Sequence, residues 1–465
     1  MPERSVVWFR RDLRVGDQPT FLAAADSSDE ALALFVFDPA LMRPSGGARL
    51  NFLYGCLREL DAALGGKLLV VEGDPAEVVP RVAEAVGAGA VHVAADFGPY
   101  GHKRDEAVEK ALADTGRELV RTGSPYAVAP GRVRKADGEP FRVFTPFRRA
   151  WTDHGWRAPA DTSASTVSWM DPADKKGGPR AVTIPDDVAV EAELPEPGEQ
   201  AALRTWADFL DAAVDHYGDD RNRPDKPATS RMSVYLKYGC IHPRTVLADL
   251  ARKRSASADT YRTEIAWREF YADILFQRPD SARKNYDRAF DALPLASGKK
   301  ADADFAAWKE GRTGFPIVDA GMRQLRAEAW MHNRLRMVVA SFLVKDLHLP
   351  WWWGARHFMQ LLVDGDLASN QHGWQWTAGS GTDASPYFRV FNPITQGEKF
   401  DPNGDYVRKY VPELRGIEGK AVHQPWALPG GVPEGYPEPI VDHKAERQEA
   451  LARYEKVKQA RGRLS

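Results

Sequence analysis

The first 130 residues alternate short apolar runs with amphipathic stretches, and this alternation constrains the fold more than any other feature of the sequence. Such alternation is typical of βαβ units and predicts a parallel, doubly wound, Rossmann-like sheet. The stretch Glu77–Val86 follows Asp74-Pro75, the order expected for a helix N-cap with proline in the first turn. No G-x-G-x-x-G follows the first run, so the usual dinucleotide fingerprint is absent. The runs expected to be strands are Val6–Phe9, Ala31–Phe37, Lys67–Val71 and Ala90–Ala94, and Arg49–Leu64 is expected to be a helix.

The rest of the chain has a different character. Residues from about 161 to 200 are rich in Pro, Asp, Ser and Gly, which is typical of a linker. From Ala201 onward the apolar spacing is helical almost throughout, and a charged final helix is expected from about Asp442 to Arg461. We therefore expect an α/β domain over residues 1–130, a long linker over 131–200 and a large all-α domain over 201–465.

Charge is distributed unevenly along the chain. The net charge is 63 − 65 = −2, but residues 1–200 carry 24 − 31 = −7 and residues 201–465 carry 39 − 34 = +5. The positive part also holds ten of the fourteen tryptophans. A basic, aromatic-rich region suits a polyanion that offers flat rings.

Targeting signals and cysteine frameworks are missing from the sequence. No apolar run is long enough to cross a bilayer, and no signal peptide precedes the first apolar run. The two cysteines, Cys56 and Cys240, form neither a disulfide framework nor a metal-ligand spacing. We expect a cytoplasmic protein without a metal site.

Three clusters in the helical part suggest chemistry. Thr229-Ser230-Arg231-Met232-Ser233 precedes an apolar run, so it predicts a hydroxyl-capped helix start that could bind phosphate, although a plain cap is the favoured interpretation of this motif alone. Glu264 and Trp267 are three residues apart and would share one helix face, where they suit a base edge and a base plane. Taken alone, this pair favours an ordinary amphipathic helix with a surface glutamate. The third cluster is Trp330–Met337, Trp351-Trp352-Trp353 and Asp364–Trp376. Core helices seldom place so many polar groups among aromatics, because each buried polar group needs a partner.

With these clusters, the sequence resembles the photolyase/cryptochrome family, and within it the class I cyclobutane pyrimidine dimer photolyases. The resemblance covers nearly the whole chain in one order. It rests on Trp8–Arg14, Thr145-Pro146-Phe147, Gly311–Pro316, Asp364-Gly365-Asp366, Phe391-Asn392-Pro393 and Val441–Lys444. It implies light-driven electron transfer from reduced FAD to a pyrimidine dimer that is flipped out of UV-damaged DNA, independently of sequence context.

The resemblance also assigns roles to individual residues. The FAD positions are Tyr217, Thr229, Ser230, Arg231, Met232 and Ser233 near the phosphates, and Arg336, Asp364, Asp366 and Asn370 near the flavin and ribose. The lesion positions are Glu264, Trp267, Asn333, Met337 and Trp376. The positions for DNA phosphates are Arg221, Arg334 and Arg389, for which surface solvation is the alternative. Trp374 and Trp351 match electron carriers.

Two further features concern light and electrons. Tyr100, Gly101, Arg104 and Asp105 resemble the stretch that binds an 8-hydroxy-5-deazaflavin antenna, with folate (MTHF) as the alternative. No tryptophan lies between Trp267 and Trp308, where the family usually has the distal electron carrier. We therefore expect slower photoreduction or another exit through Trp352 or Trp353.

Other functions are possible within and outside the family. A blue-light cryptochrome, a (6-4) photolyase and a non-repair flavin electron-transfer protein are the alternatives. The lesion set and Asn370 favour a repair enzyme, which we expect to act as a monomer without a membrane or an obligate protein partner.

Overall fold

The computed structural model describes residues 3–383 and 389–464. The chain divides into two compact units. Unit 1 comprises residues 1–190, 195–215 and 230–279, and unit 2 comprises residues 191–194, 216–229 and 280–465. Each unit is described by itself.

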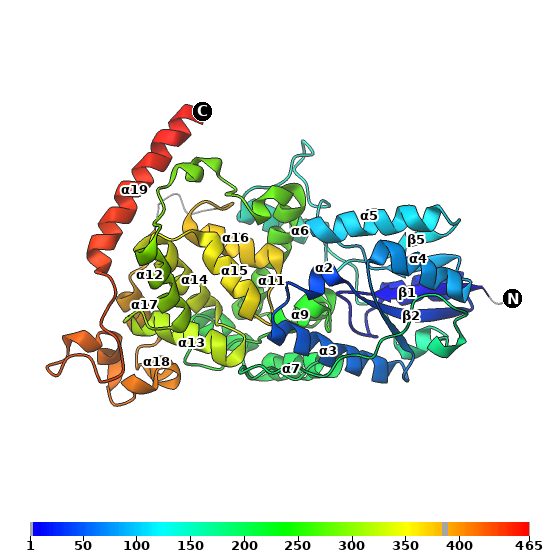
Figure 1. Cartoon of the computed structure of the whole chain (residues 1–465), viewed down its shortest axis with the longest axis horizontal. Helices are drawn as coiled ribbons and strands as arrows, with labels where there is room; N and C mark the ends of the chain where they lie inside the picture. The colour runs from blue at the N-terminus through cyan, green and yellow to red at the C-terminus, as the bar shows by residue number, and fades with distance from the viewer. Residues whose placement is uncertain (1–2, 384–388, 465) are drawn as a thin grey trace. The chain divides into compact units, whose positions relative to one another are not determined.

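Unit 1 contains a five-stranded parallel sheet with the strand order β3-β2-β1-β4-β5 (Figure 1). The strands are β1 (Arg4–Phe9), β2 (Glu30–Phe37), β3 (Leu68–Glu72), β4 (Ala90–Val93) and β5 (Glu118–Arg121). The predicted parallel sheet is confirmed, and β5 is an edge strand that the sequence prediction missed. Its segment Glu118–Arg121 has only two apolar residues and is partly exposed, so it lacks the continuous apolar run of a central strand.

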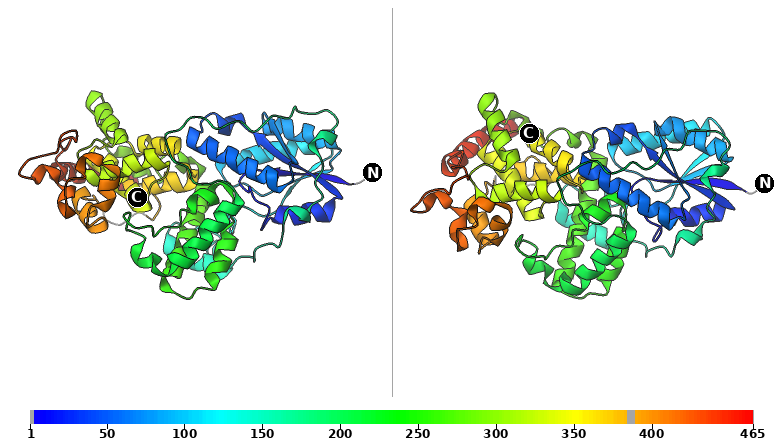
Figure 2. Two further views of the ribbon diagram at one scale, coloured as in Figure 1. Left: turned by 90° about the horizontal axis from the view of Figure 1, so that it is seen from below. Right: turned by 60° about the horizontal axis from the view of Figure 1, so that its bottom comes forward.

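Helices cover both faces of this sheet (Figure 2). The helices around it are α1 (Pro19–Ser27), α2 (Pro39–Met42), α3 (Gly47–Ala63), α4 (Pro75–Val86) and α5 (Pro99–Ala113). Buried residues of α4 and α5 pack with Trp8 on one face, while Phe9 contacts Phe21 of α1 on the other, as alternation along a strand requires. The predicted start of α4 is confirmed, since the Asp74 side chain accepts from the amide of Ala76.

Unit 1 also contains helices from the region after the sheet. They are α6 (Phe144–His154), α7 (Glu199–Ala212), α9 (Ser233–Tyr238), α10 (Pro243–Ala251) and α11 (Ala256–Gln277). Helix α6 lies inside the stretch 131–200 that the sequence assigns to a linker. The same stretch also meets the sheet, because Trp169 bridges to Ala31 and Ala181 bridges to Val71. The thiols of Cys56 and Cys240 are free and buried, with 3.5 Å between their sulfur atoms.

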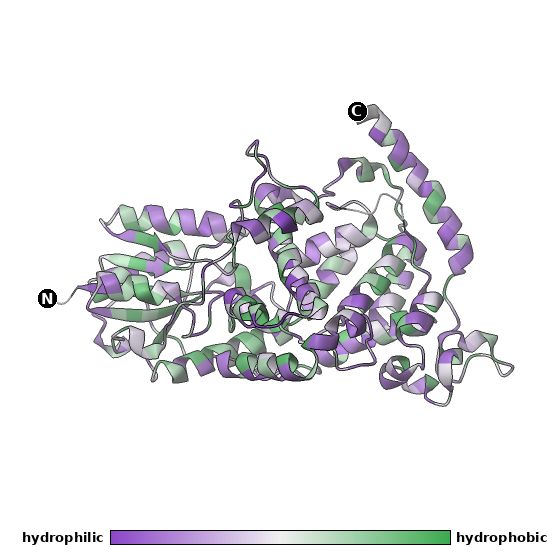
Figure 3. Ribbon diagram, turned by 180° about the vertical axis from the view of Figure 1, so that it is seen from behind, coloured by the Kyte–Doolittle hydropathy of each residue, from purple (hydrophilic) through white to green (hydrophobic). Residues whose placement is uncertain are grey.

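Unit 2 is helical in the part of the chain that the structure describes. Its helices are α8 (Tyr217–Asp220), α12 (Lys299–Glu310), α13 (Pro316–Glu328), α14 (Asn333–Ser341), α15 (Trp351–Leu361), α16 (Leu367–Ala378), α17 (Pro393–Phe400), α18 (Asp405–Tyr410) and α19 (His443–Leu464). A π-helical segment, Phe342–Asp346, follows α14 directly. Apolar side chains of α13, α14 and α15 form the core, whereas α19 is mainly hydrophilic (Figure 3).

The last helix begins close to its predicted position. Asp442 precedes α19, and its carboxylate accepts from the amides of Lys444 and Ala445. Two histidine–carboxylate pairs attach the helix to the π-helical region: His443 Nδ1 lies 2.5 Å from Asp346 Oδ1, and His348 Nε2 lies 2.7 Å from Glu446 Oε2. Among the described residues, no helix is long and apolar enough to span a membrane.

Candidate functional site

Helix α11 of unit 1 presents Glu264 and Trp267 on one half-exposed face. Ile265, Ala266 and Phe270 are buried on the other side of the helix. The spacing of three residues therefore places the carboxylate and the indole side by side, as the sequence predicts.

One face of the Trp267 ring is already covered. The ring of Phe144, at the start of α6, stacks on it with 3.7 Å between centroids and 7° between planes. Phe144 is itself buried, with 6% of its surface exposed. Trp267 can thus offer a ligand only its second face and its edge. Phe144 was missed from the sequence, because the contact joins residues that are 123 positions apart.

A buried carboxylate, Glu269, holds α6 and a loop against α11. Its oxygens accept from the amides of Ala127 and Val128 and, at 2.6 Å, from the indole nitrogen of Trp151 on α6. Burial raises the pKa of Glu269 to about 7, and the three donors oppose that shift. This role was not predictable from the sequence, since a helical glutamate is usually on the surface.

The segment expected to bind phosphate leads into α9. Its N-cap residue is Met232, whose side chain makes no cap hydrogen bond, so the predicted hydroxyl cap is wrong. Ser230 is buried instead, with its hydroxyl 2.7 Å from that of Tyr261 and accepting from the amide of Met232. Arg231, with φ of 54°, and Ser233 are exposed.

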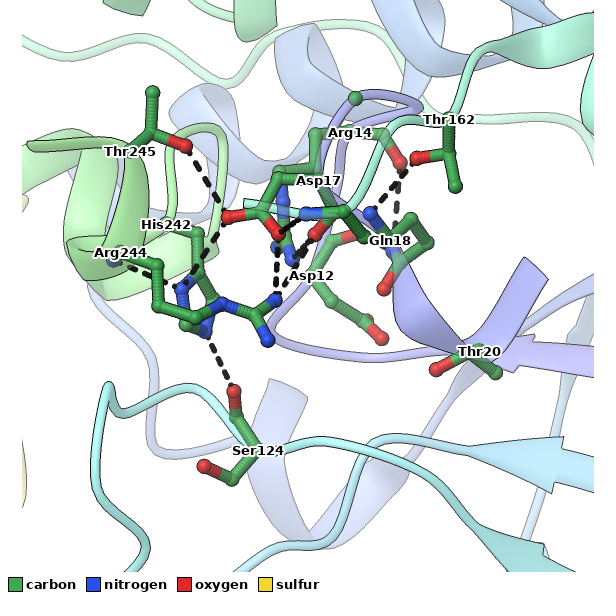
Figure 4. Close-up of polar contacts among 12 residues, drawn as sticks. Asp12, Arg14, Asp17, Gln18, Thr20, Ser124, Thr162, His242, Arg244 and Thr245 are labelled. Atoms are coloured by element: carbon green, nitrogen blue, oxygen red, sulfur yellow. Dashed lines mark hydrogen bonds and ion pairs between the residues drawn. The ribbon is translucent and has the colours of Figure 1, made fainter. Parts of the chain in front are cut away.

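A buried polar cluster joins this region to the sheet (Figure 4). Asp17, in the loop after β1, accepts from Arg244 at 2.6 Å and from the hydroxyl of Thr245 at 3.2 Å, both on α10. Beside it, burial lowers the pKa of His242 well below its ordinary value. An uncharged His242 fits this site, since Arg14 and Arg244 already supply two positive charges there.

In unit 2, α14 and α16 each have a half-exposed face with polar and aromatic side chains. Their spacing of three and four residues puts the members of each set on one face of their helix. The face of α14 consists of Asn333, Arg336 and Met337. The face of α16 consists of Asp366, Ser369, Asn370, Gly373 and Trp376, which lie on or next to that helix. Gly373 leaves room on the α16 face, because a Cβ there would meet no atom within 4 Å.

An ion pair joins α14 to the segment that precedes α16. Arg336 Nη2 donates to Asp364 Oδ2 at 2.7 Å, and the Asp364 side chain is 1% exposed. The other oxygen of Asp364, Oδ1, is buried and has no hydrogen-bond partner among the described residues. Asp366 caps α16 by accepting from the amide of Ser369, and the Asn370 amide donates to the carbonyl of Ala355.

Trp374, Trp351 and Trp352 of unit 2 make ring contacts with other aromatic side chains. Trp374 is buried, and its ring lies 6.0 Å from that of Trp308. The close approach of α15 to Trp374 depends on Gly354, where a Cβ would lie 2.1 Å from the indole. Trp351 donates to Asn285 at 2.9 Å, and its ring lies 5.8 Å from that of Trp352, which is 36% exposed.

The predicted phosphate contacts are less uniform. Arg334 donates to Asn222 at 2.6 Å and lies over the ring of Phe400. Arg221 lies 5.6 Å from the ring of the buried Tyr217. Arg389 is exposed, and its carbonyl accepts from the buried Lys345. All three arginines have part of their surface open to solvent.

The residues expected to bind an antenna lie near the carboxyl ends of β1 and β4, where the strand order reverses. Such switch points are the usual ligand site of open α/β sheets. Arg104 pairs with Asp105 at 2.8 Å and with Asp96 at 3.3 Å, and Asp105 also pairs with Arg10. Gly101 allows Asp96 to approach, since a Cβ there would lie 2.1 Å from its carboxylate, and Tyr100 donates to Asp38.

The predicted FAD and lesion residues divide between the units. Ser230, Arg231, Met232, Ser233, Glu264 and Trp267 belong to unit 1; Tyr217, Thr229, Asn333, Arg336, Met337, Asp364, Asp366, Asn370 and Trp376 belong to unit 2. Glu264 and Trp267 share a face of α11 in unit 1. In unit 2, Asn333, Arg336 and Met337 share a face of α14, and Asp366, Asn370 and Trp376 share a face of α16.

A five-stranded parallel sheet followed by a largely helical region defines a class of two-part proteins, with an α/β part and an α part. Two family descriptions match the sequence: "DNA photolyase" over residues 5–164 and "FAD binding domain of DNA photolyase" over residues 261–456. The chain belongs to the DNA photolyase family.

Individual relatives agree with this assignment. The chain is 42% identical to the deoxyribodipyrimidine photo-lyase of Streptomyces griseus, covering 98% of this chain and 99% of that protein. It resembles the crystal structure of a class III photolyase from Agrobacterium tumefaciens with a TM-score of 0.89 and 38% identity, over 99% of this chain and 98% of that one. An archaeal photolyase from Sulfolobus tokodaii, described with two FAD molecules, gives a TM-score of 0.84 and 30% identity, over 97% and 99% of the two chains.

Proposed function

We propose that the protein repairs cyclobutane pyrimidine dimers in UV-damaged DNA in a light-dependent reaction with FAD, as a deoxyribodipyrimidine photo-lyase. The observation that carries the proposal is the Arg336–Asp364 ion pair, whose arginine shares a half-exposed face of α14 with Asn333 and Met337. The family of the chain and its similarity to photo-lyases over nearly its full length support the same function.

The residues near Asp364 fit a flavin. A buried carboxylate oxygen without a partner suits a ligand that offers an N–H or O–H donor, and Gly373 leaves space on the half-exposed face of α16. Arg336, Asp364, Asp366 and Asn370 would hold the flavin and ribose. Tyr217, Thr229, Ser230, Arg231, Met232 and Ser233 would hold the phosphates. Bound in its reduced form, FAD supplies the electron that splits the dimer on illumination.

The lesion would be held by side chains with complementary chemistry. Glu264 and Asn333 would hydrogen-bond the edges of the damaged bases, and Met337 would fill the floor. Trp267 and Trp376 would stack on the bases, Trp267 with the face that Phe144 leaves open. Pairing and stacking are already weakened at a dimer, which lowers the cost of flipping and contributes to selectivity.

The DNA backbone would be contacted by Arg221, Arg334 and Arg389. Contacts to phosphates position a duplex without reading its sequence, so binding should be independent of sequence context and should weaken as salt rises. We propose that the protein acts as a monomer.

The sheet would hold an antenna at its switch point, with Tyr100, Gly101, Arg104 and Asp105 as contacts. We favour 8-hydroxy-5-deazaflavin over a folate, because this stretch has Tyr100-Gly101 where folate-binding members tend to have Asn-Glu. We also retain the functional division into an antenna domain (1–130), a linker (131–200) and a catalytic domain (201–465).

Within the family we propose a class I enzyme, with class III as the alternative because the chain also resembles a class III structure. Trp374 and Trp351 would carry electrons during photoreduction. Trp352 is the favoured exit, since its exposed ring adjoins that of Trp351. A tryptophan radical that is unchanged by Trp352→Phe and Trp353→Phe in transient absorption would exclude both as carriers.

The repair assay uses flavin-loaded, reduced protein and an oligonucleotide with a single thymine dimer. Illumination should convert the dimer to two thymines, whereas the dark sample and the undamaged strand stay unchanged, as followed by chromatography. Glu264→Ala should weaken binding of the dimer strand and leave the flavin spectrum intact. A cryptochrome or a non-repair electron-transfer protein would bind flavin and leave the dimer intact in the light, and that result would refute the proposal.

A further inference from the structure

We propose that Phe144 is a positioning residue for lesion binding: it fixes the plane of the Trp267 indole and limits it to one stacking face. The inference rests on the proposed function, since it assumes that Trp267 contacts the damaged bases. Every contact that carries it lies within unit 1.

The stacking geometry is the first step. A centroid distance of 3.7 Å with planes 7° apart is a full-face stack, whereas the other aromatic neighbours of Trp267 are inclined. Phe270 meets it at 75° and Tyr271 at 43°. Among these three rings, only Phe144 is parallel to the indole and sets its plane. It covers one of the two indole faces, so a base can stack only on the other.

The second step is the anchoring of Phe144. It begins α6, on which Phe144, Phe147 and Trp151 are the buried residues. Trp151 donates to Glu269 of α11 at 2.6 Å, and this hydrogen bond anchors α6. Since Glu269 belongs to the same helix as Trp267, α6 and the indole are fixed on a common support.

A fixed ring should bind a base more tightly than a mobile one. An indole without the Phe144 contact would lose rotamer freedom when it stacks on a flipped base. Because Phe144 already restricts the Trp267 side chain in the free protein, binding requires no further loss of its conformational entropy. The consequence is specific to the lesion, because undamaged duplex binds through phosphate contacts that do not involve this ring.

The test compares Phe144→Leu with Phe147→Leu. Both remove one buried ring from the same helix, but Phe147 meets Phe270 at 53° and has no ring contact with Trp267 among the described residues. Phe144→Leu should weaken affinity for the thymine-dimer oligonucleotide by about 2- to 12-fold, the range expected when binding must immobilise one further side chain. Its affinity for undamaged DNA, and both affinities of Phe147→Leu, should stay at the wild-type level.

A spectroscopic readout separates positioning from general destabilisation. In protein labelled with 5-fluorotryptophan, the ¹⁹F resonance of Trp267 is assigned by its loss in Trp267→Phe. It should shift or broaden in Phe144→Leu and stay in place in Phe147→Leu. Phe144→Tyr, which retains a ring, should restore both the resonance and the affinity.

Two results would overturn the inference: equal losses of affinity in Phe144→Leu and Phe147→Leu, or a Trp267 resonance that does not change in Phe144→Leu. If Phe144→Leu does not fold, Phe144→Met is measured in its place, because methionine also removes the ring and its flexible side chain fills irregular gaps in a core. Wild-type protein that neither binds nor repairs the dimer would refute the proposed function instead, while the ¹⁹F comparison would still test the positioning of Trp267.

Discussion

Each unit buries a carboxylate and an indole next to its half-exposed face, and the two pairs differ in how completely they are bonded. In unit 1, both oxygens of Glu269 and the indole nitrogen of Trp151 have partners. In unit 2, Asp364 Oδ1 and the indole nitrogen of Trp374 are buried without a partner among the described residues. Buried polar atoms are normally satisfied. The comparison indicates that the Glu269–Trp151 contact is complete as folded, whereas Asp364 and Trp374 leave buried polar atoms that a ligand can satisfy.

The largest expected effect comes from breaking the ion pair of unit 2. Arg336→Ala would leave the buried Asp364 without its cation, and such a change costs about 3–5 kcal/mol. We expect the purified variant to retain little flavin and to unfold at a lower temperature, as measured by absorption near 450 nm and calorimetry.

Arg323→Ala is the matched control for that variant. Arg323 pairs with Glu413 at the same distance, 2.7 Å, in the same unit but outside the predicted flavin positions. It should keep its flavin. Equal flavin contents in the two variants would contradict the role of the Arg336–Asp364 pair.

The next effect concerns unit 1 and its dependence on pH. The pKa of Glu269 is about 7 in the folded chain, above the ordinary value of 4.5, so the folded state binds more protons between these two values. Stability should therefore fall as pH rises from about 5 to 7, by about 3 kcal/mol in total from this group. Denaturant unfolding of wild type and Glu269→Gln at several pH values checks this.

The difference between those two proteins isolates Glu269 from other titrating groups. Glu269→Gln should show a flatter pH dependence over this range, because the amide does not titrate. Parallel pH profiles would mean that Glu269 stays ionised in the folded chain, held by its three donors.

The strength of each signal in the sequence explains what could be predicted. The sheet was predictable because Val6–Phe9 and Ala31–Phe37 are long apolar runs, whereas β5 has too few apolar residues to stand out. The Glu264–Trp267 face follows from helical spacing alone. Phe144, Glu269 and Gly354 were not predictable, since their roles come from contacts with residues distant in the sequence. The roles within the flavin and lesion sets came from family resemblance.

The smallest expected effect compares the two indoles directly. Trp151→Phe and Trp374→Phe remove the same volume from buried positions, but only the Trp151 nitrogen has a hydrogen-bond partner. Losing a bond to a carboxylate costs about 1–3 kcal/mol, so in flavin-free protein Trp151→Phe should be the more destabilised variant by roughly that amount. Denaturant unfolding measures the difference.

Transient absorption of the flavin-loaded proteins gives an independent readout. Photoreduction should fail in Trp374→Phe and persist in Trp151→Phe, because only Trp374 is a proposed electron carrier. Equal stabilities would show that the Trp151–Glu269 bond contributes nothing net, and the contrast between the two units would then rest on Asp364 alone.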